Sequence, residues 1–164
     1  MAGTTGTLTA SVVALLSSIE TGINVRVAAI EAGDMSLKAI GIRSIVAQNV
    51  SVEIAESAGH AQYPALLVYC DKVQNLLTEK SRAFSGRVHL AIEVRHSQDK
   101  LALLEQHTHL YADAVCALLD DSRGDWGDGA FYTGGYLVNY EPVVKGGKNF
   151  LQRAKVNFAL EVSD

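Results

Sequence analysis

The sequence predicts a single domain of the α+β class, spanning residues 1–164, with a mixed, mainly antiparallel sheet and two main helices packed on one face of it. Strict alternation of apolar and polar residues indicates strands at 87–95, 136–141 and 154–162. Apolar residues that recur every three or four positions indicate a long helix over 98–121. A chain of 164 residues is long enough to bury one substantial core.

A first helix is predicted near the start of the chain. Thr7 or Thr9 is a suitable N-cap, and Thr21 and Gly22 provide a stop. The apolar residues between these signals fall at helical spacing, and they are Leu8, Val12, Leu15, Leu16 and Ile19.

Residues 22–60 fit more than one structure. The segment 23–33 begins with β-branched residues, which favour a strand, and ends in AAIEAG, which favours a helix. The segment 36–48 fits either a helix interrupted at Gly41 or a pair of strands. The alternation in 50–54 indicates a short strand.

The pattern changes after Pro64. The continuous apolar run 65–70 predicts a strand that is buried on both faces. Residues 71–83 are mostly polar, and we expect a connection with helical character over 72–80.

The predicted strand 87–95 has one buried face and one solvent-exposed face. The residues assigned to the buried face are Val88, Leu90, Ile92 and Val94. The residues assigned to solvent are Arg87, His89, Ala91, Glu93 and Arg95.

The long helix is predicted to follow, with Ser97 as N-cap and Asp99 in its first turn. Its apolar stripe consists of Leu101, Leu104, Thr108, Tyr111, Val115 and Leu118. The Asp- and Gly-rich segment 120–129 predicts a loop. The last two strands are predicted to form a hairpin, in which Gly146 and Gly147 supply the positive φ angles of a tight turn.

Composition limits the possible functions. The formal net charge is −4, which argues against a dedicated nucleic-acid-binding protein. Cys70 and Cys116 lie in apolar patterns and are expected to be buried free thiols. The sequence lacks the positive region of a signal peptide, and no apolar run approaches about 18 residues. We therefore expect a protein made in a cytoplasm, without a membrane span.

No residue pattern predicts catalysis or a bound cofactor. A P-loop, a GxSxG motif and a CxxC motif are absent, and the acidic residues of 120–128 lack the spacing of a calcium loop. Glu93 and Glu141 are more simply explained as solvated strand charges than as paired catalytic carboxylates. We expect no enzyme, no cofactor and no metal, although a small metal-dependent enzyme using His89, His109 and Asp113 is an alternative.

Aromatic residues gather late in the chain, at Trp126, Phe131, Tyr132, Tyr136, Tyr140 and Phe150. Several of them flank loops rather than fill regular core positions. Amphipathic aromatics at partly exposed positions are typical of protein interfaces, but the same residues also fit a role in covering the end of the core.

The second half of the sequence resembles the tail terminator, or tail completion, proteins of tailed bacteriophages. The resemblance is carried by the strand RVHLAIEVRHS (87–97), the helix 98–121 and the hairpin YLVNYEPVVKGGKNFLQRAKVNFALEV (136–162). Upstream, YPALLVY (63–69) fits the early strand of that family. The resemblance covers roughly residues 64–162, and the first helix is a further plausible match.

This resemblance implies a structural protein of the virion tail, assembled in the host cytoplasm. Such subunits form a hexameric ring at the head-proximal end of the tail tube, end tube polymerisation and mediate head–tail joining. The implied partners are further copies of the chain, the tail tube protein, a neck or connector protein and, transiently, the passing DNA. A head–tail connector, a neck adaptor or another minor tail protein is an alternative with the same size and ring symmetry.

Within such a ring, the hairpin 136–162 is the candidate contact with a neighbouring subunit or with the tube. Lys145, Lys148 and Arg153 lie near its tip and can meet DNA phosphates weakly if they face the lumen. Trp126, Tyr140 and Phe150 complete the candidate interface residues. An ordinary solvated hairpin turn explains the same tip without a function.

Overall fold

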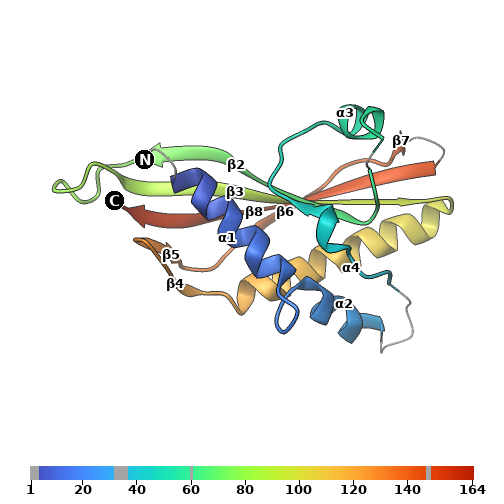
Figure 1. The fold of residues 1–164 in the computed structure, drawn as a ribbon, viewed down its shortest axis with the longest axis horizontal. Coiled ribbons are helices and arrows are strands. Elements are labelled where there is room, and N and C mark those ends of the chain that lie inside the picture. The colour runs from blue at the N-terminus through green and yellow to red at the C-terminus, as the bar shows by residue number, and fades with distance from the viewer. Residues whose placement is uncertain (1–3, 32–36, 60, 147–148) are drawn as a thin grey trace.

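The computed structural model describes residues 4–31, 37–59, 61–146 and 149–164, with the backbone but not the side chain of Glu31. It confirms the predicted α+β class, because α-helices pack on an eight-stranded, mostly antiparallel sheet (Figure 1). The strand order is β1-β2-β3-β8-β5-β4, and β6 and β7 also pair with β8.

Three long strands form the centre of the sheet. They are β2 (Ala65–Asn75), β3 (Ser85–Gln98) and β8 (Asn149–Ser163). β3 pairs antiparallel with β2 on one side and, along its whole length, with β8 on the other. The β2–β3 turn and the end of β8 therefore lie at one end of the sheet, and the β7–β8 hairpin lies at the other (Figure 1).

Short strands cover the two sides of this centre unequally. β1 (Ile45–Val46) runs parallel to β2 and pairs only with Leu66 and Leu67. On the other side, β8 is covered in pieces by β7 (Val144–Gly146), β6 (Leu137–Tyr140) and β5 (Ala130–Tyr132), with β4 (Gly124–Gly127) outside β5. Within the described part of the chain, residues 68–75 of β2 have β3 as a neighbour on one side and no strand on the other.

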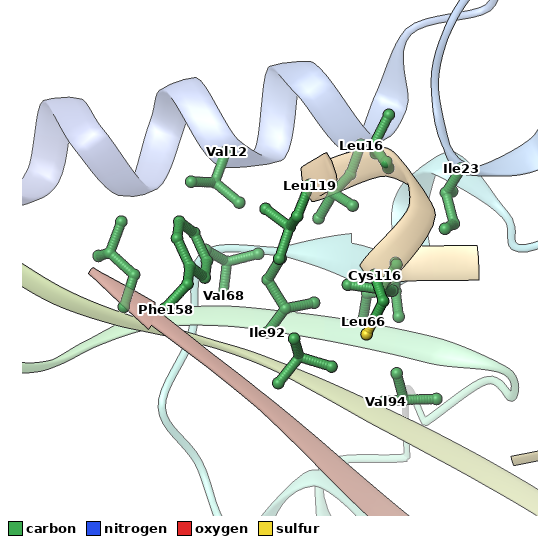
Figure 2. Packing of buried hydrophobic residues seen from close by; sticks show 14 of the residues in the cluster. Val12, Leu16, Ile23, Leu66, Val68, Ile92, Val94, Cys116, Leu119 and Phe158 are labelled. Atoms are coloured by element: carbon green, nitrogen blue, oxygen red, sulfur yellow. The ribbon is translucent and has the colours of Figure 1, made fainter. Parts of the chain in front are cut away.

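Three helices lie on one face of the sheet: α1 (Thr4–Ser17), α2 (Ile23–Glu31) and α4 (Leu101–Asp120). Figure 2 shows Val12 of α1 and Leu119 of α4 pointing into the same apolar layer as Phe158 of β8. Removal of this apolar surface from water is the main favourable contribution to folding. The short α3 (Val52–Ser57) lies instead toward the opposite face, next to Leu67 and Arg95.

The start of α1 differs from the sequence prediction. The helix already includes Thr4, so the predicted caps Thr7 and Thr9 lie inside it. The helix ends at Ser17, and Ile19, which was assigned to the apolar stripe, is 86% exposed in the following turn. The stripe positions that are buried as predicted are Leu8, Val12 and Leu16.

The ambiguous region 22–60 is resolved mainly by helix caps and distant contacts. The helical alternative is correct for the described part of 23–33, because α2 occupies Ile23–Glu31. Neither alternative for 36–48 is correct for its described part, which contains a 3₁₀ turn (Ile42–Ser44) followed by β1. The predicted strand at 50–54 is wrong, because Ser51 accepts a hydrogen bond from the backbone N–H of Ile54 and caps α3.

Asn24 fixes the segment that follows α2. Its side-chain amide donates to the carbonyl oxygen of Ile40, and its amide oxygen accepts from the Ile40 N–H, each at 2.8 Å. The Tyr111 hydroxyl on α4 donates to the carbonyl oxygen of Lys38 at 2.5 Å. Leu37 and Ile40 are thereby held in the core, where both are buried.

β2 is longer than predicted. Residues 66–69 are buried on both faces, as expected, but the strand continues through a bulge between Cys70 and Lys72 and ends at Asn75. The predicted helical character of 72–80 is therefore wrong. Residues 71–75 are polar apart from Val73 and mostly exposed, and so short a polar segment does not distinguish a strand from a helix.

One face of β3 is more buried than predicted. Ala91, Glu93 and Arg95 are 0%, 6% and 3% exposed, although the alternation assigned them to solvent. The reason is a cover from a distant part of the chain, since Val46 and Val50 pack on this face beside Ala91. The assignment of Glu93 to a solvated strand face is therefore wrong.

The boundaries around α4 also differ from the prediction. Ser97 belongs to β3, and the N-cap position of α4 is Lys100, without a side-chain cap bond. Leu101 is 54% exposed, whereas the rest of the predicted stripe is buried. The predicted loop 120–129 contains β4, which pairs with β5. No described helix has both the length and the apolar character needed to cross a membrane.

We predict that Asn24→Ala lowers the free energy of unfolding by about 1–3 kcal/mol, because it leaves the buried backbone groups of Ile40 without partners. Urea denaturation followed by circular dichroism measures this change. The control is Asn139→Ala on the exposed side of β6, which should change stability by no more than about 0.5 kcal/mol. Equal losses for the two variants would contradict the role of Asn24.

Candidate assembly surface

Most of the predicted interface residues lie in one part of the structure, which we call the arm: Tyr136, β6, β7 and the first half of β8, all within residues 136–146 and 149–157. Tyr140 pairs with Ala154, and Lys145 pairs with Phe150. By strand alternation, these residues face the side of the sheet that carries α4, and Arg153 faces the opposite side. The ring of Tyr140 accordingly lies 4.3 Å from the ring of His109 on α4.

The arm exposes large apolar side chains. They are Tyr136 (39% exposed), Leu137 (62%), Tyr140 (42%), Val144 (42%) and Phe150 (42%). Leu137 pairs with Asn157 and Val144 with Leu151, so these two side chains lie on the face opposite Tyr140. The exposed apolar surface therefore extends over both faces of the arm, and such surfaces commonly mark protein–protein contacts.

The basic tip predicted from the sequence is only partly a free cationic cluster. Lys145 is exposed and has no ion-pair partner among the described residues. Arg153 donates through Nη2 to the carboxylate of Glu141, which offsets its charge. Lys148 lies outside the described residues. The tip therefore favours weak rather than tight contact with phosphates.

Gly146 serves close packing rather than a positive φ angle. It ends β7 opposite Asn149 and does not have a positive φ, contrary to the prediction, and Gly147 lies outside the described residues. A Cβ at Gly146 would lie 2.8 Å from Cβ of Leu151 and 3.1 Å from Oε1 of Glu56. Glycine at this position therefore lets the arm approach α3.

Trp126 does not belong to the arm. Its ring lies 5.9 Å from that of Tyr132 and 6.3 Å from that of Phe158, and its indole N–H donates to the carbonyl oxygen of Ser122 at 2.7 Å. Phe158 is roughly 26 Å along β8 from Phe150, at about 3.3 Å per residue. Trp126 therefore covers one end of the core, which was the alternative explanation for the late aromatics.

A buried polar network lies on the sheet face opposite α1 and α4. Glu93 accepts hydrogen bonds from the Tyr69 hydroxyl at 2.9 Å and from Nε of Arg95 at 2.7 Å. Arg95 also donates to the carbonyl oxygen of Val50. The Lys155 ammonium lies 5.5 Å from the centroid of the Tyr69 ring. Sequence reasoning missed this network, because it is buried by a segment that lies far earlier in the chain, with Val50 45 positions before Arg95.

The surroundings in this network shift the pKa values of Tyr69 and Lys155. Desolvation raises the pKa of the Tyr69 hydroxyl, so it stays protonated and donates to Glu93 at neutral pH. The neighbouring Tyr69 hydroxyl raises the pKa of Lys155 above its ordinary value. Tyr69 is therefore neutral and Lys155 charged near neutral pH, and the hydrogen bonds of the network support the sheet on this face.

The residues of the metal-site alternative do not come together. His89 lies on the same sheet face as Glu93, with Nε2 2.9 Å from Oε1 of Gln74. His109 belongs to α4, which covers the opposite face, and Asp113 is on the same helix. Over the ranges that the structure describes, no group of three or more His, Cys, Asp or Glu side chains is arranged to hold a metal ion.

Both cysteines are free. Cys116 is buried, as predicted, whereas Cys70 is half-buried. Burial raises the pKa of Cys116 to about 11, so the thiol is protonated and poorly nucleophilic at neutral pH.

His96 is a buried titratable group between β3 and α4. It is 5% exposed, its ring lies 5.2 Å from that of Tyr111 and 5.6 Å from that of His107, and its Nε2 lies 3.1 Å from the side-chain nitrogen of Gln98. Burial, with smaller contributions from His107 and Lys38, lowers its pKa to about 4.

We predict that Glu93→Ala destabilises the protein by about 3–5 kcal/mol, because it leaves the buried guanidinium of Arg95 without its anion. Urea denaturation at neutral pH measures the loss. Glu161→Ala is the control, since its ion pair with Arg87 is exposed and should contribute no more than about 1 kcal/mol. A loss for Glu93→Ala no larger than that of the control would contradict the network.

We predict that the protein loses stability as the pH falls from 6.5 toward 4, because the unfolded chain binds the proton of His96 more tightly than the folded chain does. The contribution of this histidine is fully present above about pH 6.5, and its loss at pH 4 is on the order of 3 kcal/mol. Urea denaturation across this range should show a flatter pH dependence for His96→Gln than for the wild type. His109→Gln is the exposed control, and a wild-type slope for His96→Gln would contradict the assignment.

No model of a known protein family matches this sequence. The search of curated proteins likewise finds no relative.

Proposed function

We propose that this protein is a structural subunit of a phage tail, a tail terminator that assembles with copies of itself into a ring at the head-proximal end of the tail tube. The observation that carries the proposal is the arm, where paired strands expose large apolar side chains on both faces, including Tyr140, Val144 and Phe150. The resemblance of residues 64–162 to tail terminators supplies the biological setting.

The sheet offers different surfaces on its two sides, as a cyclic ring requires. In such a ring, one surface of each copy contacts a different surface of the next copy, and rotation closes the chain of contacts. The arm lies on the β8 side of the sheet, and the uncovered part of β2 lies on the other side. Covering the apolar side chains of the arm by a partner would stabilise the assembly.

A ring of this kind ends tube polymerisation by occupying the growing end and presenting a surface that the tube protein does not bind. A neck or connector protein then joins the tail to the head on that surface. The charges of the tip suit a transient contact with passing DNA, because Glu141 neutralises Arg153 while Lys145 stays free of ion pairs in the described chain. We propose no catalytic role and a location in the virion tail.

A head–tail connector, a neck adaptor or another minor tail protein is the second candidate, since it uses the same ring-forming surfaces. The partner distinguishes the two candidates. A tail terminator binds the ends of purified tail tubes, whereas a neck protein binds the head and leaves bare tubes free.

We predict that the double variant Tyr140→Ser with Phe150→Ser weakens self-association roughly tenfold or more, because buried aromatic side chains contribute strongly to interfaces. Sedimentation velocity over a range of concentrations measures the association. The matched control is Ile19→Ser with Ile54→Ser, which removes two exposed apolar side chains outside the arm (86% and 63% exposed).

The control should assemble as the wild type does, and both variants should keep the wild-type circular dichroism spectrum. Wild-type assembly by the arm variant would contradict a role of the arm in the ring.

A further inference from the structure

We propose that the open edge of β2 receives the β4–β5 hairpin of a second copy of this chain, with Lys72 facing Asp125 across the contact. This inference rests on the proposed ring and identifies the surface that receives the β8 side of the neighbouring subunit.

The receiving edge is the uncovered part of β2. Residues 71–73 and Asn75 are exposed, and the strand has no second strand neighbour beyond Leu67 in the described chain. Backbone N–H and C=O groups on such an edge are free to pair with another strand. No proline lies between residues 68 and 75 to block this pairing.

The occupant is the strand at the opposite border of the same sheet. β4 pairs with β5 and has no further strand neighbour in the described chain. The arm and the β4–β5 hairpin both lie on the β8 side, so a contact through β4 is continuous with the proposed interface of the arm. A copy that presents this side to the β2 side of the next copy forms the head-to-tail contact of a ring.

The strand register places the edge strands β2 and β4 at the same level along the strand direction. One row of paired residues crosses the whole sheet, and its members are Gln74, Arg87, Glu161, Phe131 and Asp125. All copies in a cyclic ring lie at the same level along the ring axis. Where the strands run along that axis, an edge residue of one copy therefore meets the residue of the same row on the facing edge of the next copy. Asp125 of one copy then stands beside Gln74 of the next.

Lys72 and Asp125 also lie on the same face of the sheet. Lys72 pairs with His89, which is two residues from Arg87 on β3, and therefore points to the same side as the row that contains Asp125. The separation of Lys72 and Gln74 along the strand is about 7 Å, which a lysine side chain spans.

Lys72 and Asp125 carry opposite charges, and both charges remain open to a partner outside the subunit. Both residues are exposed, and neither has an ion-pair partner among the described residues. Asp125 accepts one hydrogen bond, from the N–H of Gly127 to Oδ1 at 2.8 Å, which leaves Oδ2 for a partner. The neighbouring Asp120 and Asp121 are instead paired with Arg123 and Arg26 within the subunit.

The flanking charges favour the same arrangement. The β2–β3 turn adds Lys80 and Arg82 against Glu79, and the β4–β5 turn adds Asp128. The opposite net charges of these two turns favour this pairing over contacts between like edges. Four successive antiparallel pairings relate β2 to β4, so the new contact is parallel, as is the pairing of β1 with β2.

Charge exchange tests this contact. We predict that Lys72→Glu and Asp125→Lys each weaken self-association roughly tenfold, because each places two like charges in contact. The double variant Lys72→Glu with Asp125→Lys should return to within about threefold of the wild type, because the pair is restored with reversed sign. Sedimentation velocity gives the association constants, and electron micrographs of negatively stained samples show whether rings form.

Two controls separate charge from folding. Lys100→Glu makes the same charge change at an exposed position before α4 and should assemble as the wild type does. Asp125→Asn keeps an oxygen acceptor for the Gly127 N–H but removes the charge, and it should weaken assembly less than Asp125→Lys. Thermal melting checks that each variant is folded.

Failure of this contact is distinguishable from failure of the proposed function. Rings that form equally well with either single variant, or a double variant weaker than both, overturn the Lys72–Asp125 contact and leave the ring standing. A wild-type chain that forms no ring at any concentration and also fails to bind the ends of purified tail tubes contradicts the ring itself and this contact with it.

Discussion

The pairing of β3 with β8 is the interaction on which the rest of the structure depends. All fourteen residues of β3 pair with β8, in a single register from Ser85 to Gln98. This register puts Val94 beside Ala154 and Ile92 beside Val156, which creates one apolar face for α1 and α4. It also puts Glu93 beside Lys155 on the other face, where the polar network forms. A shift of one residue would exchange the two faces and destroy both.

Alternation in the sequence predicted strands at 87–95 and 154–162, which lie within β3 and β8, because each strand has its own period-two signal. It did not predict that these two strands pair with each other. The buried positions Val88, Leu90, Ile92 and Val94 were all correctly assigned. The errors lie where distant segments decide the outcome. Glu93 and Arg95 have the alternation of exposed residues, and only a segment near Val50 buries them. The short helix α3 depends on a single cap, the hydrogen bond that Ser51 accepts from the Ile54 N–H. The apolar–polar alternation of residues 50–54 is too short to outweigh this cap.

The candidate surface was predictable only in part. Tyr140 and Phe150 were identified correctly as partly exposed aromatics, because they flank loops in the sequence. Trp126 has the same local signal but packs on Tyr132 and Phe158, which sequence proximity does not reveal. Arg153 was assigned to a basic tip, whereas its partner Glu141 lies across the arm. The open edge of β2 was missed, because residues 72–80 were expected to have helical character.

These features together describe a sheet with two unlike sides. One side ends in short strands that carry exposed apolar residues and an acidic hairpin. The other side ends in β2, whose residues 68–75 have no outer strand neighbour in the described chain, and the turn that follows β2 is basic. A molecule with complementary sides is suited to head-to-tail contacts with its own copies, and closure of those contacts gives a ring. The arrangement supports the proposal of a structural subunit more strongly than any catalytic alternative.

The most direct test is the mass of the wild-type protein by size-exclusion chromatography with light scattering, over a wide range of concentrations and in the presence of purified tail tubes. Electron micrographs of negatively stained material complete the measurement. We predict a hexameric species with a central hole, free in solution or at the tube end. A monomer at every concentration that also fails to bind tubes would contradict it.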